Sequence, residues 1–282
     1  MKIKITSDST CDLNKDQVIN NDIGIIPLYV ILGDKSYFDN GVDVTPLNVF
    51  DYINQTKQLP HTAALSEDEY AEHFEKYLAD YDEVIHFNIS SKASLTHESA
   101  KKAAARFNGK VHVIDSQHLS TGQGLLVLKA CDMLKEGKTA TEIVSAINGL
   151  RGKVNTSFVP DSLDNLHKGG RCSLAALMGA KILKLHPMID MKDGKLYAKK
   201  KYMGNIDRCL KQYVTELSQS YHYYDKTRCF ITHSHCSPET VEKVKELVNS
   251  LFSFDEVVET YAGCTVSVHC GQGTLGVLFI HD

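Results

Sequence analysis

Several features that mark specialised protein classes are missing from this 282-residue chain. It has no Trp, and its 18 Gly and 6 Pro are too few for a collagen-like, linker-like or disordered protein. No apolar run approaches the roughly 20 residues that a membrane-spanning helix needs. The opening residues, MKIKITSDST, lack the apolar core of a signal peptide. We therefore expect a cytoplasmic globular protein.

The chain also lacks the excess of positive charge found in proteins that coat DNA or RNA. Its 31 Lys and Arg are outnumbered by 35 Asp and Glu, which leaves a formal net charge of −4. Proteins that bind the phosphate backbone broadly are usually basic, because each contact neutralises a phosphate. We expect no nucleic-acid partner.

Eight cysteines are present, but none of them forms a C-x-x-C pair. In a cytosolic protein such cysteines usually pack as small apolar side chains, so no disulfide framework is expected. One cluster leaves a metal site open as an alternative: Cys229, His233, His235 and Cys236. In a strand, His233 and His235 would share a face, but zinc ligands usually occur in pairs with a different spacing. We favour a partly buried strand end, and we predict no metal or cofactor.

Strands and helices alternate along the first half of the chain. Apolar patterns typical of strands occur at 2–5, 23–31, 84–89 and 111–114. Patterns typical of helices occur at 66–80, 98–107, 122–135 and 139–150. This alternation predicts an α/β fold, with a parallel or mixed sheet covered by helices.

The pattern changes after Gly152, and the length alone suits two domains. We therefore expect an N-terminal α/β domain over 1–154 and a C-terminal mixed α/β domain over 155–282. In the second domain we predict short helices within 161–180 and longer ones starting at Ile206 and Ser237. Strands are predicted at 155–160, 227–232, 257–260, 265–269 and 275–281. Residues 182–191 are apolar with one Pro, and a hairpin turn is predicted at Asp193–Gly194.

Three predicted strands run into loops rich in hydroxyl groups and carboxylates. These loops are Ser7–Thr10, Ser90–Ser94 and Asp115–Ser116. In open α/β sheets, ligands bind beyond the carboxyl ends of the strands. Each loop alone is explained as well by helix capping. The three together favour a shared binding site.

A G-x-G-x-x-G pattern at 271–276 does not predict a dinucleotide site. That fold needs a helix after the glycines, whereas Val277–Ile280 is typical of a strand. We expect the glycines to form a tight turn where the backbone approaches another segment. Neither a Walker A sequence nor a G-x-S-x-G elbow is present, so no motif predicts catalysis.

Six motifs follow one another between residue 6 and residue 276. They are TSDSTCDL at 6–13, ISSKASLT at 89–96, VIDS with a later GQG at 113–124, KGGRCS at 168–173, DGK at 193–195, and HCGQGTLG at 269–276. In this order they resemble the bacterial DegV family, which includes the fatty-acid-binding subunits of fatty acid kinase.

The resemblance implies a two-domain α/β carrier that encloses one long-chain fatty acid between its domains and has no catalytic activity of its own. It implies that Thr62, Ser94 and His269 hold the carboxylate. A fatty acid kinase or another acyl-handling enzyme would be the protein partner, and transient membrane contact is consistent with such a carrier. The run Lys199–Lys201 suits either a solvated rim or a docking surface for an acidic partner or lipid headgroups.

Three positions depart from the family pattern. Gln272 replaces a Pro, and Lys92 replaces a common Gly, which brings a positive charge near the expected anion site. Met203 or Tyr202 stands where kinase-coupled members carry a basic residue, which puts kinase coupling in question.

Two alternatives to a carrier stay open. One is a small-molecule phosphotransferase or hydrolase that uses the same loops, and the other is a regulatory interaction module with a structural lipid.

Overall fold

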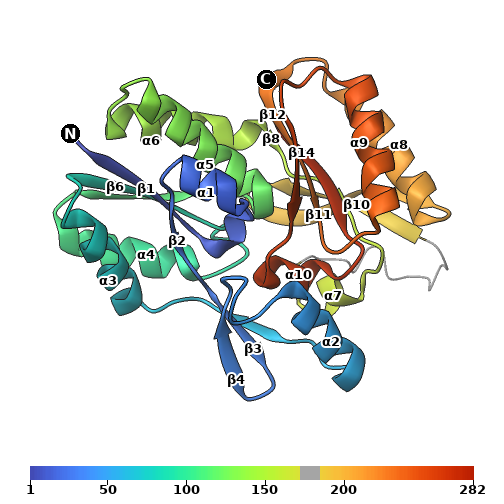
Figure 1. The fold of residues 1–282 in the computed structure, drawn as a ribbon, viewed down its shortest axis with the longest axis horizontal. Coiled ribbons are helices and arrows are strands. Elements are labelled where there is room, and N and C mark those ends of the chain that lie inside the picture. Colours follow the sequence, from blue (N-terminus) through green and yellow to red (C-terminus); the bar gives the residue numbers. More distant parts are fainter. Residues whose placement is uncertain (172–184) are drawn as a thin grey trace.

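A computed structural model describes residues 1–171 and 185–282 of the chain. These residues form a four-stranded parallel sheet, a larger mixed sheet and a small three-stranded sheet (Figure 1). The expected mixed α/β architecture is confirmed. None of the described helices combines the length and apolar character that a membrane crossing requires.

The parallel sheet is built by the first half of the chain. Its strands lie in the order β2 (Gly24–Ile26), β1 (Ile3–Asp8), β6 (Glu83–Asn88) and β7 (Val111–Asp115). Four helices cover it: α3 (Glu67–Leu78) and α4 (Thr96–Ala104) on one face, α5 (Ser120–Lys135) and α6 (Ala140–Leu150) on the other (Figure 1).

Alternation along β6 explains this arrangement. Ile85 and Phe87 belong to the apolar core with α5 and α6, whereas Val84 belongs to the core with α3 and α4. Successive side chains of a strand point to opposite faces, so one strand supplies both layers. Its carboxyl end is left at the edge where the polar loops begin.

The second half forms the mixed sheet. Its strands lie in the order β11 (Lys195–Met203), β10 (Leu185–Lys192), β9 (Phe158–Val159), β14 (Leu275–His281), β12 (Tyr224–His233) and β13 (Val257–Tyr261), and β8 (Val154–Asn155) also pairs with β14. Helices α8 (Ile206–Ser220) and α9 (Pro238–Leu251) share a core with one face. Phe230, Leu278 and Ile280 share a core with α5, which joins the two halves.

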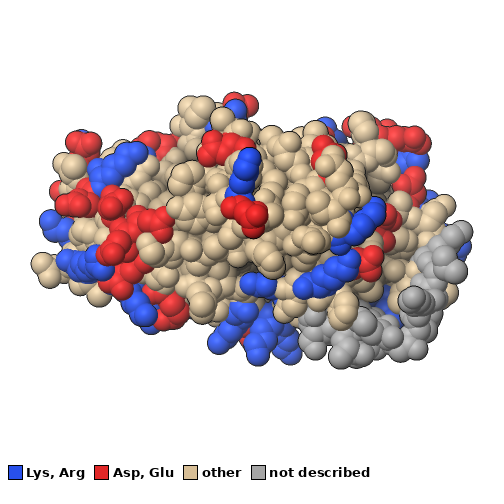
Figure 2. Space-filling view, turned by 90° about the horizontal axis from the view of Figure 1, so that it is seen from below, with Lys and Arg blue, Asp and Glu red and all other residues tan. Residues whose placement is uncertain are grey.

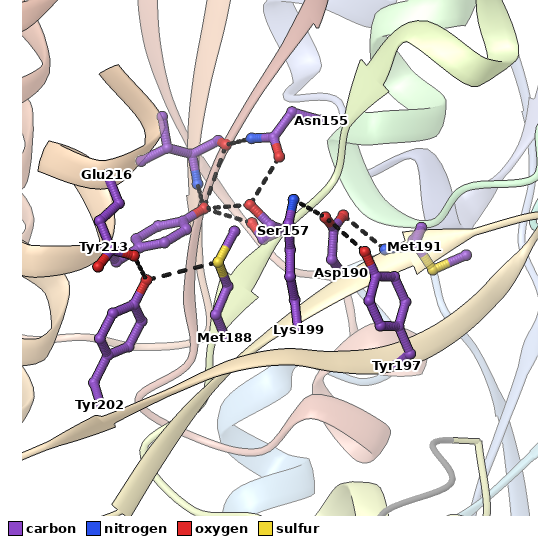
Figure 3. A network of polar contacts seen from close by, with 11 residues as sticks. Asn155, Ser157, Met188, Asp190, Met191, Tyr197, Lys199, Tyr202, Tyr213 and Glu216 are labelled. Carbon is purple, nitrogen blue, oxygen red and sulfur yellow. Dashed lines mark hydrogen bonds and ion pairs between the residues drawn. The ribbon is translucent and has the colours of Figure 1, made fainter. Parts of the chain in front are cut away.

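A buried polar network fixes α8 to this sheet (Figure 3). The Tyr213 hydroxyl donates to the Ser157 carbonyl at 2.6 Å and accepts from the Val277 N–H at 3.0 Å. Tyr202 on β11 donates to Glu216 of α8 at 2.8 Å. The β10–β11 hairpin is thereby held in place, with its turn at Asp193–Gly194 as predicted.

The small sheet was not predicted. Its strands lie in the order β4 (Lys35–Phe38), β3 (Tyr29–Leu32) and β5 (His61–Ala63). Helix α2 (Pro46–Thr56) lies between β4 and β5 in the sequence. The single strand expected over 23–31 is instead divided, because β2 joins the parallel sheet and β3 joins the small one. Pro27 lies between them and has no N–H to donate to a sheet. Helix α1 (Lys15–Asn20) was also unexpected.

The predicted strand at 265–269 is wrong. These residues belong to a helix, α10 (Cys264–Cys270). Asp39 accepts hydrogen bonds from the N–H groups of Cys264 and Thr265, both at 2.9 Å. The first amides of a helix need such partners, so a tertiary contact overrides the local preference of Thr and Val for strands. The predictions for 172–184, including the last residues of the KGGRCS motif, lie outside the described residues.

Candidate functional site

A pocket lies where the small sheet, the β11 edge of the mixed sheet, the loop after β6 and helix α10 approach one another. Its cavity volume is about 200 Å³. Most lining residues are apolar, and they include Leu28, Ile89, Leu95, Leu119, Leu196 and Val266. The polar lining residues are Thr62, Ser94, Arg171, Thr265 and His269. The pocket therefore combines an apolar wall with a few polar groups.

The three residues that the resemblance implied all line this pocket. Thr62 comes from β5, Ser94 from the loop after β6, and His269 from α10. The Thr62 hydroxyl oxygen lies 3.0 Å from Nε2 of His269. Segments that are far apart in the sequence thus bring their polar side chains to one cavity.

The His269 ring is held on both sides. Thr62 contacts Nε2, whereas Nδ1 is buried, faces Gly169 and has no hydrogen-bond partner within 1–171 and 185–282. A Cβ atom at Gly169 would lie 2.6 Å from Nδ1. Burial and, to a smaller extent, the nearby charge of Arg171 together lower the pKa of His269 to about 4. The imidazole is therefore neutral near pH 7.

Ser94 also takes part in the start of α4. Its hydroxyl oxygen accepts the Thr96 N–H at 3.2 Å, and its proton is directed to the Thr96 hydroxyl at 2.9 Å. A hydroxyl has one proton and two lone pairs. Ser94 can therefore turn its proton toward the pocket while it keeps the backbone contact.

The three loops at the ends of β1, β6 and β7 lie together, as their parallel strands require. Asp8 accepts the Ile89 N–H at 2.8 Å, and Asp115 accepts the Ser91 N–H at 3.0 Å. Of these loops, the one after β6 supplies lining residues, including Ser94. Asp8 and Asp115 do not line the pocket, but they hold that loop in place by accepting its backbone N–H groups.

Helix α10 is fixed to the first half of the chain by two carboxylates. Besides the Asp39 contacts, Asp12 accepts the Gly263 N–H at 2.8 Å and the Ser120 hydroxyl at 2.5 Å. Burial raises the pKa of Asp12 well above its usual value, and these two hydrogen bonds oppose that rise. The backbone that carries His269 is thereby positioned by residues more than 200 positions earlier.

The sequence interpretation missed two polar lining residues. Arg171 belongs to the KGGRCS motif, but nothing in its spacing pointed to a cavity. Its guanidinium donates to the Gly169 carbonyl at 2.7 Å. Thr265 was assigned to a strand, which hid its helical spacing from His269. Lys92, expected near the anion site, is not among the lining residues, and its stem lies against Gly194 in the hairpin turn.

The cysteine and histidine cluster at 229–236 has a different arrangement from the one required for metal binding. His233 ends β12 and contacts Glu259 at 3.2 Å, while His235 lies beyond the strand, beside Phe50 and Tyr261. The two histidines therefore do not share a strand face. Within 1–171 and 185–282, no group of three or more ligating side chains could hold a metal ion.

The glycines at 271–276 form the expected turn. Gly271 and Gly273 have φ angles of +82° and +80°, a region that favours glycine. A Cβ atom at Gly273 would lie 2.8 Å from Cβ of Asp161. Strand β14 follows directly, so the glycines form a turn packed closely against the Asp161 side chain and not a dinucleotide loop.

The comparisons with known proteins agree with these motifs. The family model for DegV, described as a family of uncharacterised proteins, matches residues 2–282. A DegV domain-containing protein of Clostridium acetobutylicum is 33% identical over 99% of this chain and 98% of its own length. The chain belongs to the DegV family.

Solved structures of DegV proteins share this fold. A fatty-acid-binding DegV protein from Thermus thermophilus is 27% identical and superimposes with a TM-score of 0.92 over 100% of both chains. A Thermotoga maritima protein reported to have a fatty-acid-binding function is 26% identical, with a TM-score of 0.87 over 99% of both chains. A stearic acid-binding protein from Eubacterium ventriosum is also 26% identical, with a TM-score of 0.85 over 99% of this chain and 98% of that one.

Proposed function

We propose that this DegV protein binds one long-chain fatty acid in the pocket described above. The observation that carries the proposal is the meeting of Thr62, Ser94 and His269 in a cavity whose other lining is mostly apolar. A fatty acid has the same division, with one charged group on a long hydrocarbon chain. The fatty-acid-binding relatives, which share the fold over nearly the whole chain, support the assignment.

In this proposal the hydroxyl groups of Thr62 and Ser94 donate to the carboxylate. His269 donates its Nε2 proton to Thr62, which leaves the Thr62 hydroxyl proton for the ligand. Arg171 supplies positive charge beside the same group. Short hydrogen bonds to an ionised carboxylate are among the stronger polar contacts in proteins.

The acyl tail provides most of the binding free energy. Each buried methylene contributes about 0.8 kcal/mol, so a dozen give on the order of 10 kcal/mol before the cost of association. The tail lies against the apolar lining, which includes Ile89, Leu119 and Val266. We propose that the chain acts as a carrier without catalytic activity, and that it needs no cofactor besides the bound lipid.

We further propose an acyl-handling enzyme, such as a fatty acid kinase, as the partner. Lys199 and Lys200 are engaged by Asp190 and Glu216, which supports a solvated rim at this run. Tyr202 is buried while Met203 is exposed, so Met203 offers an apolar contact where a basic one was expected. Figure 2 shows Lys and Arg side chains gathered at the lower edge of the view, near the middle of its width, which supports an anionic partner or transient contact with lipid headgroups.

The division into domains at 1–154 and 155–282 belongs to the same proposal. The strands of the parallel and small sheets precede residue 154, and those of the mixed sheet follow it. Within the described part of the chain, six cysteines are free thiols, which supports a reducing compartment such as the bacterial cytoplasm: Cys11, Cys131, Cys209, Cys229, Cys236 and Cys264. The fatty acid would then lie between the two domains.

Mass spectrometry of an organic extract tests the proposal directly. Protein purified from bacteria should release about one fatty acid per chain, and lipid-free protein should take up labelled palmitate or oleate. Failure of both would contradict the proposal. Exchange of the bound lipid within minutes supports a carrier, whereas a lipid that never exchanges favours the regulatory module. ATP turnover that disappears when a pocket residue is changed would favour the phosphotransferase.

A further inference from the structure

The hydroxyl group of Thr265 differs from the other hydroxyls of the pocket in its hydrogen bonding. Thr265 is 95% buried and lines the pocket, yet its Oγ1 atom has no hydrogen-bond partner among the residues that the structure describes. Thr62 and Ser94, the other hydroxyl residues in the described lining, contact His269 and Thr96. An unsatisfied buried polar group is costly, so its presence in a binding cavity needs an explanation.

A second cavity adjoins the pocket, and the hydroxyl groups that line it consistently have hydrogen-bond partners. It shares Leu119, Val266 and Cys270 with the pocket. Its hydroxyl side chains all have partners within the protein: Ser120, Thr156, Thr232, Ser234 and Thr274. Thr265 is therefore an exception among the described lining residues of both cavities.

Helical spacing places Thr265 beside His269. The two residues are four positions apart on α10, so they lie on the same face of the helix. Four residues of helix advance about 6 Å along the axis. A ligand whose carboxylate lies at His269 therefore presents the first few carbons of its chain to Thr265.

The charges at the two ends of α10 differ in sign, and this decides what Thr265 can bind. At the Thr265 end, the carboxylate of Asp39 already accepts the N–H groups of Cys264 and Thr265. At the His269 end stands the guanidinium of Arg171. A ligand carboxylate is repelled from the first end and attracted to the second. Thr265 therefore suits a neutral oxygen atom.

We infer that the pocket accepts fatty acids with a hydroxyl group near the carboxylate, and that Thr265 recognises this hydroxyl. The inference rests on the proposed function, since it extends the same pocket. A threonine hydroxyl both donates and accepts, so it can pair with a ligand hydroxyl in either direction. The hydroxylated ligand satisfies Oγ1, which an unsubstituted acyl chain leaves without a partner.

Competition binding with three acids of equal length tests this inference: palmitate, 3-hydroxypalmitate and 16-hydroxypalmitate. The wild-type protein should prefer 3-hydroxypalmitate over palmitate by about two- to tenfold, the effect of one net hydrogen bond. It should show no such preference for the 16-hydroxy acid, whose hydroxyl lies at the far end of the tail.

Two variants of Thr265 complete the test. Thr265→Val keeps the shape of the side chain and removes the hydroxyl, so the ratio of the two affinities should fall to about one. Thr265→Ser keeps the hydroxyl and should keep the preference. Equal binding of palmitate and 3-hydroxypalmitate by the wild type, or an unchanged ratio in Thr265→Val, would overturn the inference while the proposed function stands. Binding of neither acid by the wild type would overturn both.

Discussion

The hydroxyl of Thr62 lies 3.0 Å from Nε2 of His269, although 207 positions separate the two residues. This contact joins the small antiparallel sheet to α10 at the pocket. Gly169 packs against the opposite side of the ring, and Asp39 holds the beginning of the helix. The polar part of the pocket is therefore assembled by residues that do not contact the ligand as well as by those that do.

Ser94→Ala should weaken palmitate binding about tenfold to a hundredfold. The loss of one hydrogen bond to a charged carboxylate costs roughly 1.5–3 kcal/mol. Because Ser94 also accepts the Thr96 N–H, we expect a smaller loss of stability beside the loss of affinity. Palmitate affinity and thermal unfolding of lipid-free protein measure the two effects.

Ser91→Ala is the matched control for this change. Ser91 lies in the same loop and contacts Asp115, but it is not among the lining residues of the pocket. It should lower stability without a comparable loss of affinity. If both variants bind palmitate equally well, Ser94 does not hold the carboxylate.

Gly169→Ala should impair binding because it displaces His269. The added Cβ would lie 2.6 Å from Nδ1 of His269 and 2.9 Å from the Asn165 carbonyl oxygen, both too close for normal contact. Titration with palmitate should give a clearly weaker affinity. Gly152→Ala is the control, because nothing lies within 4 Å of its added Cβ. Equal affinities for the two variants would show that the ring needs no space at Gly169.

Asp39→Ala should destabilise α10. The change removes two charge-assisted hydrogen bonds, to Cys264 and Thr265, each contributing about 1.5–3 kcal/mol. Chemical denaturation should give a lower free energy of unfolding, and palmitate should bind more weakly because His269 is carried by this helix. Asp43→Ala, on the exposed segment that follows, should change neither quantity. A wild-type unfolding curve for Asp39→Ala would contradict the anchoring role.

Lowering the pH should destabilise the lipid-free protein through His269. Burial lowers the pKa of His269 to about 4 in the folded state, below the value of 6.5 for an unperturbed histidine. Between these two values the unfolded chain binds the proton more readily. The free energy of unfolding therefore falls as the pH drops through 6.5, and the loss is complete below about 4.

His73 has a pKa lowered in the same way, so the contribution of His269 must be isolated by comparison. Urea denaturation of the wild type and of His269→Gln at pH 7, 6 and 5 provides this comparison. The variant should show the shallower dependence on pH. Parallel curves would mean that His269 titrates normally in the folded protein.

The sequence predicted elements whose local signals agree with their final environment. Helices α3, α6 and α9 have N-cap residues at the predicted positions, because each cap forms its hydrogen bonds within one helical turn: Ser66, Thr139 and Ser237. Elements that depend on distant partners were missed. Helix α10 needs carboxylates from the first half of the chain, and β2 and β3 separate because they pair with different sheets.

The same distinction applies to the site. Thr62, Ser94 and His269 were named through the family resemblance, since no spacing in the sequence relates them. In the predicted strand, Thr265, Ser267 and His269 would have shared one face. In the helix, Thr265 and His269 line the pocket while Ser267 contacts Ser234. Because this segment was predicted as a strand, the sequence did not indicate that Thr265 lines the pocket. Its hydroxyl is the one without a hydrogen-bond partner among the described lining residues.

The separation of Thr62 from His269 also sets an order of events on the ribosome. At about 5–20 residues per second, the 207 positions between them take roughly 10–40 s to synthesise. During that interval Asp12 and Asp39 have been made, but the amides that they will accept have not. The nascent chain thus cannot complete the pocket, and it cannot hold a fatty acid until translation has passed α10.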